Sequence, residues 1–88
     1  MKVLVPERLA DPGIELLEQD FEVDVLLDLS PEELLRKIGD YDGLIIRSAT
    51  KVTAEVVERA GNLKAIGRAG IGVDNIDIEA ATKRGIIV

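Results

Sequence analysis

The 88-residue chain contains no histidine, no cysteine and no tryptophan, and only one tyrosine and one phenylalanine. Histidine is the commonest general acid–base residue, and cysteine supplies thiol nucleophiles, disulfides and zinc ligands. Their absence excludes Cys/His zinc sites, cysteine nucleophiles and Ser-His-Asp triads. We therefore expect no metal site in this chain.

Long apolar runs are also absent. No stretch approaches the roughly 20 residues of a membrane-spanning helix, and the amino terminus becomes charged too soon for a signal peptide. We expect no membrane partner and take the cytoplasm as the default location. Hydrophobic residues make up 47% and charged residues 32% of the chain, a balance typical of a folded domain. Residues 1–88 leave room for one domain only.

The charge is unevenly distributed along the chain. Eleven basic and 17 acidic residues give a net charge of −6, which disfavours non-specific binding to nucleic acid or to an anionic membrane. Residues 1–44 carry four basic and twelve acidic side chains, whereas residues 45–88 carry seven basic and five acidic ones. An anionic ligand would therefore prefer the second half.

Short apolar runs alternate with segments that have helical spacing. The runs predict strands at Lys2–Val5, Phe21–Leu27, Gly43–Arg47, Leu63–Gly67 and Gly85–Val88. Helix start signals stand between them at Asp11-Pro12, at Ser30-Pro31 with Glu33 three residues after the cap, at Thr53 and at Asp77. Gly61 and Gly85 are suited to close the last two helices.

Strand–helix alternation predicts a doubly wound α/β domain with a parallel sheet, because parallel strands need crossover connections. We expect a flavodoxin-like, five-stranded sheet of order 2-1-3-4-5. The second run alternates apolar and acidic residues, which is typical of an edge strand. No helix follows Val88 to cover the last strands. We therefore expect an exposed apolar face and a truncated domain.

Basic and small residues follow the third and fourth strands. In an open α/β sheet the ligand site lies beyond the carboxyl ends of the strands. The basic residues expected there are Arg8, Arg47, Lys51 and Arg68. Backbone N–H groups around Gly70–Gly72 are suited to form an anion-binding concavity. Two simpler interpretations stay open: the cations are solvated loop charges, or the glycines only make a tight turn.

Two long segments resemble a known family. One runs from Tyr41 to Thr53 and includes Ile-Ile-Arg-Ser-Ala-Thr-Lys; the other runs from Leu63 to Asp77 and includes Gly-Arg-Ala-Gly-Ile-Gly-Val-Asp-Asn-Ile-Asp. Together with the Glu79–Ala81 helix and Gly85–Val88 they cover most of the chain. The sequence resembles the D-isomer-specific 2-hydroxyacid dehydrogenases, and the resemblance implies the amino-terminal part of their substrate domain.

That family transfers a hydride between NAD and C2 of a 2-hydroxy acid. The resemblance places substrate contacts on Arg47 and Ser48 and on the backbone of Gly70, Ile71 and Gly72, with Asn75 close by. The family's catalytic Arg, Glu and His, and its Gly-x-Gly-x-x-Gly segment, lie downstream of residue 88. The resemblance therefore implies that this chain holds no catalytic residue and binds no NAD itself.

Two hypotheses about function follow. In the first, the chain is an inactive substrate-binding fragment that holds a small anionic 2-hydroxy acid weakly, because half a cleft leaves the ligand solvated. In the alternative, it is an excised or engineered flavodoxin-like scaffold without activity. For either, we expect a homodimer formed through the uncovered face near the fifth strand.

Overall fold

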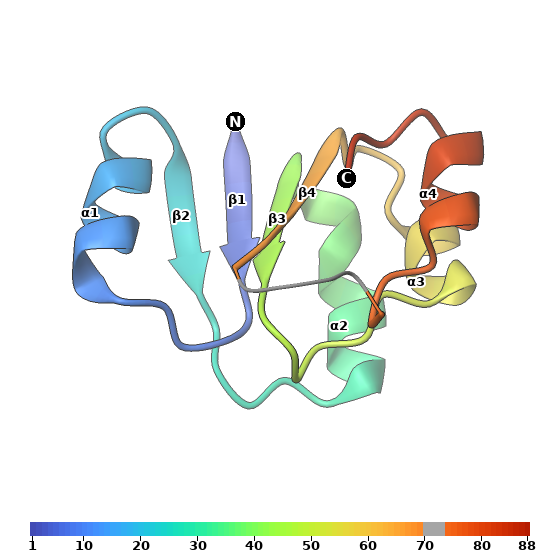
Figure 1. The fold of residues 1–88 in the computed structure, drawn as a ribbon, viewed down its shortest axis with the longest axis horizontal. Helices are drawn as coiled ribbons and strands as arrows, with labels where there is room; N and C mark the ends of the chain where they lie inside the picture. Colours follow the sequence, from blue (N-terminus) through green and yellow to red (C-terminus); the bar gives the residue numbers. More distant parts are fainter. Residues whose placement is uncertain (70–73) are drawn as a thin grey trace.

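The chain forms a parallel sheet with helices between the strands. The computed structural model describes residues 1–69 and 74–88. Its strands are β1 (Lys2–Val5), β2 (Glu22–Val25), β3 (Gly43–Ile46) and β4 (Ala65–Arg68). Its helices are α1 (Asp11–Glu18), α2 (Pro31–Lys37), the 3-10 helix η1 (Ile38–Asp40), α3 (Ala54–Arg59) and α4 (Ile78–Lys83). The strand order is β2-β1-β3-β4, all parallel (Figure 1), which confirms the predicted α/β class and the first four positions of the order.

The predicted fifth strand is wrong for the part of the chain that the structure describes. Within Gly85–Val88, Ile87 alone forms a bridge, and it pairs with Ala65. Its N–H donates to the carbonyl of Lys64 at 3.0 Å, and its carbonyl accepts from the N–H of Ile66 at 2.7 Å. Gly85 turns the chain at a φ of +74° just after α4. The segment therefore reaches β4 only at Ile87, and a single bridge does not make a strand.

The core fills the space between the sheet and one layer of helices. Leu4, Leu44 and Ile46 project from the strands into a buried cluster that includes Ile38 and Val57. In Figure 1, α2 lies behind β3 and β4, and α3 and α4 lie to the right of the sheet; α3 contacts both of the other two helices. This layer buries the face of the sheet on which the even-numbered residues of β1, β3 and β4 lie.

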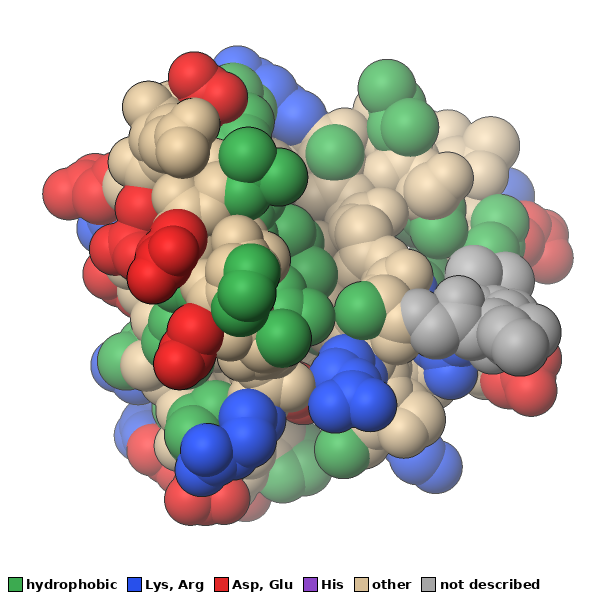
Figure 2. All heavy atoms as spheres, turned by 60° about the vertical axis from the view of Figure 1, so that its left-hand side comes forward, with side chains coloured by type: hydrophobic (Ala, Val, Ile, Leu, Met, Phe, Trp, Pro, Cys, Tyr) green, Lys and Arg blue, Asp and Glu red, His purple; other side chains and the backbone are tan. Residues whose placement is uncertain are grey.

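The opposite face of the sheet is only partly covered. Helix α1 stands beside β2 and has no buried residue (Figure 1). On β4, Ala65 and Gly67 face solvent, and beyond them Ile87 is 74% exposed. Figure 2, which brings the α1 side forward, shows a band of apolar side chains next to a group of acidic ones. Near the end of the chain, the exposed side chains of Ile87 and Val88 provide the apolar surface that was expected there.

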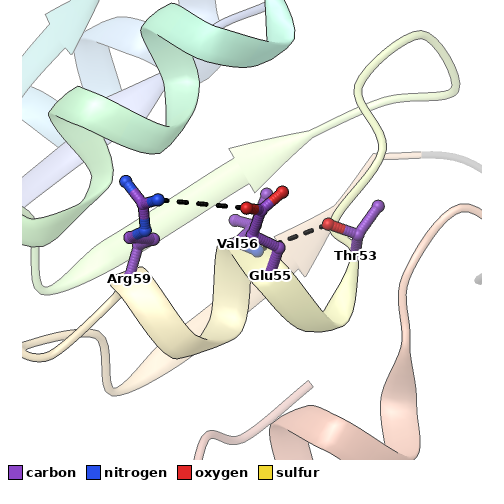
Figure 3. Close-up of polar contacts among 4 residues, drawn as sticks. All are labelled: Thr53, Glu55, Val56 and Arg59. Atoms are coloured by element: carbon purple, nitrogen blue, oxygen red, sulfur yellow. Dashed lines mark hydrogen bonds and ion pairs between the residues drawn. The ribbon is translucent and has the colours of Figure 1, made fainter.

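Side-chain caps explain where three of the helices begin. Ser30 Oγ accepts from the N–H of Glu33 at 3.2 Å, and the Glu33 carboxylate accepts from the N–H of Ser30 at 3.1 Å, which completes a capping box. Thr53 Oγ1 accepts from the N–H of Val56 at 3.3 Å (Figure 3). Asp77 caps α4 through the N–H of Ala80 at 3.0 Å. These three predicted caps are therefore confirmed, whereas at Asp11-Pro12 the helix begins at Asp11 itself and the N-cap residue, Ala10, makes no side-chain cap bond.

Strand β2 occupies an edge, as its alternating sequence predicts. Its Asp24 accepts a hydrogen bond from the hydroxyl of Tyr41, whose ring is buried beside the sheet. Among the helices that the structure describes, none has the length and apolar character needed to cross a bilayer.

Candidate functional site

The candidate site is an open groove at the carboxyl edge of the sheet. It has a volume of about 940 Å³ and lies between the loops that follow β1, β2 and β3 and the starts of α2 and α3. Figure 2 shows Lys and Arg side chains along the lower part of the face that it displays, which is the end at which the strands terminate in Figure 1. Topology thus brings together loops that are far apart in sequence, as expected for an open parallel sheet.

The Glu7 carboxylate accepts hydrogen bonds from three backbone N–H groups at this edge. Its Oε2 accepts from the N–H of Arg47 at 2.6 Å and of Thr50 at 3.0 Å, and its Oε1 accepts from the N–H of Ala49 at 3.0 Å. These donors belong to the loop after β3, whereas Glu7 follows β1. The converging backbone N–H groups of the loop after β3 are therefore already bonded to an anion of the protein itself, the Glu7 carboxylate.

These bonds shift the ionisation of Glu7. Partial burial alone would raise the pKa of the carboxyl group, because it disfavours the charged form. The hydrogen bonds from Arg47, Ala49 and Thr50 favour the charged form and together outweigh burial, so the pKa is lowered from its ordinary value. Glu7 is accordingly an anion at neutral pH.

The Asn75 amide binds the same loop from the other side. Its Nδ2 donates to the carbonyl of Arg47 and to that of Thr50, each at 2.6 Å. Its Oδ1 accepts from Nε of Arg68 at 2.7 Å. Both amide protons and the amide oxygen are thus engaged by protein groups, and Asn75 connects the loop after β4 to the loop after β3.

The side chains of Arg47 and Ser48 line the groove and are exposed. Arg47 makes one long hydrogen bond, from Nη1 to the carbonyl of Arg8 at 3.4 Å. Arg8 and Lys51 also line the groove, so three of the four cations predicted for this edge meet there. Arg68 lies on the far side of Asn75 and is not among the lining residues.

The residues predicted for the site therefore do not all lie in the groove. Arg47 and Ser48 face the groove, and Asn75 supports their loop. Gly70, Ile71 and Gly72 lie outside the residues that the structure describes. No role was predicted for Glu7 from the sequence, although one signal was present: it is an acidic residue two positions after a buried strand, at an edge expected to gather cations.

The groove has a polar end and an apolar wall. The polar end offers the Arg47 guanidinium and the hydroxyl of Ser48, which suit a carboxylate or phosphate. The wall is apolar and comes mainly from α2 and the loop before it; it consists of Leu27, Leu29, Pro31, Leu34 and Leu35. Such a surface can orient a small anion, while the described residues arrange no group of three or more Asp or Glu side chains to hold a metal.

The structure is thus a parallel α/β domain with exposed cationic side chains at the carboxyl edge of its sheet. The chain belongs to the D-isomer specific 2-hydroxyacid dehydrogenase family, whose catalytic domain profile matches residues 3–88.

Individual relatives point to the same family. The chain is 57% identical to D-3-phosphoglycerate dehydrogenase of Methanocaldococcus jannaschii over 88 residues, and 53% identical to the enzyme of the same name from Archaeoglobus fulgidus over 89 residues. All of the chain is aligned in both cases, but it spans only 17% of the length of either relative. The known activity is thus that of a much longer protein.

Solved structures show the same fold. A crystal structure of a protein from Pyrococcus horikoshii matches 97% of the chain with a TM-score of 0.93 and 45% identity, over 26% of its own length. The NAD⁺-bound 3-phosphoglycerate dehydrogenase of Entamoeba histolytica matches 98% of the chain with a TM-score of 0.86 and 35% identity, over 31% of its length.

Proposed function

We propose that the chain is the substrate-anion-binding part of an NAD-dependent D-3-phosphoglycerate dehydrogenase, the oxidoreductase that opens serine biosynthesis. The intact enzyme would move a hydride from C2 of a 2-hydroxy acid to NAD. Identity above 50% to two enzymes of that name supports this proposal. The observation that carries it is the pair of exposed side chains, Arg47 and Ser48, that face a groove of suitable size.

The role of this chain is to bind and orient, not to transfer hydride. The guanidinium of Arg47 can pair with two oxygens of a carboxylate or phosphate, and the hydroxyl of Ser48 can donate to a third. Lys51 and Arg8 add positive charge along the same groove. The groups that move the proton at the 2-hydroxyl would come from the rest of the enzyme.

The described residues do not fit NAD. A dinucleotide needs a glycine-rich turn after the first strand, with free N–H groups facing the pyrophosphate. Here β1 is followed by Pro6 and Glu7, and the N–H groups of Arg47, Ala49 and Thr50 are bonded to the Glu7 carboxylate. NAD would therefore be held by other parts of the enzyme.

The alternative of an excised or engineered scaffold without activity has no support in the comparisons. Relatives at 51–57% identity are enzymes from archaea, plants and animals. Such similarity extends over the whole chain, including the groove.

Titration with 3-phosphoglycerate tests the proposal. In amide NMR spectra of the 15N-labelled chain at low ionic strength, the ligand should shift resonances of residues 47–51 with weak, roughly millimolar affinity. Arg47→Ala should abolish the shifts. Lys83→Ala removes the same charge from the last residue of α4, a helix that contributes no lining residue to the groove, and should leave them unchanged. No shift in residues 47–51 at several millimolar ligand would contradict the proposal.

A further inference from the structure

The four-residue loop Arg47–Thr50 is bonded from two sides by side chains that come from two other loops. Glu7, after β1, accepts three of its backbone N–H groups. Asn75, after β4, donates to two of its backbone carbonyls. Five backbone groups of one loop are thus satisfied by two side chains, which leaves the loop little freedom to rearrange.

The geometry requires a carboxylate at position 7. Three N–H groups converge on two oxygens, and only a carboxylate offers acceptors on both. A glutamine in the same place would turn an NH₂ group toward one or two of these donors. Charge also matters, because hydrogen bonds to an ionised acceptor are shorter and stronger than bonds to a neutral one.

The geometry likewise requires an amide at position 75. Nδ2 lies between two carbonyl oxygens, and Oδ1 receives the Nε–H of Arg68. An aspartate there would place an oxygen against the carbonyls of Arg47 and Thr50. Arg68 therefore fixes which way the amide points, and the amide fixes the loop.

We propose that Glu7 and Asn75 are positioning residues that hold the Arg47–Thr50 loop in the conformation that presents the Arg47 guanidinium and the Ser48 hydroxyl to the anion. Because Glu7 takes up the loop's own donors, the ligand is recognised through the side chains of Arg47 and Ser48 and not through this loop's backbone. This rests on the proposed function, since it assumes that the anion binds at Arg47. It assigns to Asn75 a supporting role in place of ligand contact.

The first test needs no ligand. In Glu7→Gln, the N–H groups of Arg47, Ala49 and Thr50 should exchange with solvent at least tenfold faster than in the wild type, while amides of the core strand β3 keep their rates. Glu15→Gln makes the same change on the exposed face of α1 and should alter none of them. Unchanged exchange at all three positions in a folded Glu7→Gln protein would overturn the proposal.

A pH titration of the wild-type chain covers the case in which Glu7→Gln does not fold. The amide resonances of Arg47, Ala49 and Thr50 should titrate together with the side-chain carboxyl carbon of Glu7. The other charged groups that line the groove are Arg8, Asp28, Arg47, Lys51 and Glu55; Asp28 and Glu55 are followed separately through their own carboxyl carbons. If the three amides followed one of those two groups, or did not titrate, Glu7 would not hold the loop.

The second test uses 3-phosphoglycerate. Glu7→Gln and Asn75→Asp should each weaken its binding roughly tenfold, with Glu7→Asp retaining part of the affinity because it keeps the charge. Wild-type binding that both variants leave unaltered would contradict the positioning role. If the wild type binds no ligand, the proposed function fails, and the exchange measurement still decides whether Glu7 holds the loop.

Discussion

The hydroxyl of Tyr41 donates a 2.6 Å hydrogen bond to Oδ2 of Asp24 and so joins the segment before β3 to the edge strand β2. Burial of the ring, followed by the hydrogen bond and charge of Asp24 and the charges of Asp40 and Glu22, raises the pKa of Tyr41 to about 12. The chain has one tyrosine and no tryptophan, so this ionisation can be followed by absorbance.

We expect the tyrosinate absorbance of the folded chain to rise with a midpoint near pH 12. Asp24→Asn should lower the pKa of Tyr41, because it removes a negative charge next to the phenol. The unfolded pKa is near 10, so the folded state binds more protons between the two values and stability falls as pH rises through this window. An Asp24→Asn titration identical to that of the wild type would contradict the assignment.

Glu7 should make the free energy of unfolding depend on pH in the acid range. Its pKa is lower in the folded state than in the unfolded chain, so its contribution is complete above the unfolded pKa and is lost as pH falls through the folded pKa. Urea unfolding should show the largest difference in unfolding free energy between the wild type and Glu7→Gln at neutral pH. That difference should shrink steadily toward pH 3, and a constant difference would count against the shift.

Loss of the cap on α2 should be measurable. Ser30→Ala removes the acceptor for the N–H of Glu33 and should lower the unfolding free energy by about 1 kcal/mol. Ser48→Ala removes a hydroxyl from an exposed loop position that caps no helix, and should leave stability nearly unchanged. Equal urea midpoints for the two variants would contradict the capping role.

Self-association is expected through the uncovered face beside β4. Ile87→Asp places a charge on the most exposed large apolar side chain of the described residues, which is 74% exposed, and its backbone bonds to β4 do not depend on the side chain. Light scattering over a dilution series should show a dimer for the wild type and a monomer for Ile87→Asp. Leu16→Asp, on α1 at 65% exposure, is the control and should stay dimeric; a wild-type monomer at all concentrations would refute the dimer.

Much of the fold could be predicted because its signals are local. Ser30, Thr53 and Asp77 each bind an N–H three residues ahead, so the sequence alone identifies them as caps. Strand pairing is not local. The apolar residues at 86–88 have the composition of a strand, but the structure gives them one bridge to Ala65, and composition does not reveal where a ladder stops.

The site could be predicted in part, because the strand order decides which loops meet. Topology gathers the ends of parallel strands, so the meeting of Arg8, Arg47 and Lys51 followed from the strand order. Which side chains contact the ligand and which support the loop depends on hydrogen bonds between residues about 40 apart, as for Glu7 and Arg47. Residue types and spacing do not carry that information.

The strand order also has a consequence for how the chain assembles. Val3 of β1 pairs with Val23 of β2, which closes the first loop of the sheet. Val3 also pairs with Gly43 of β3, and this pairing closes a loop about twice as long. After β2, each new strand is added on the same side, β3 beside β1 and then β4 beside β3. The sheet can therefore grow in one direction as synthesis proceeds, so that the outermost strand present at any stage serves as the template for the next.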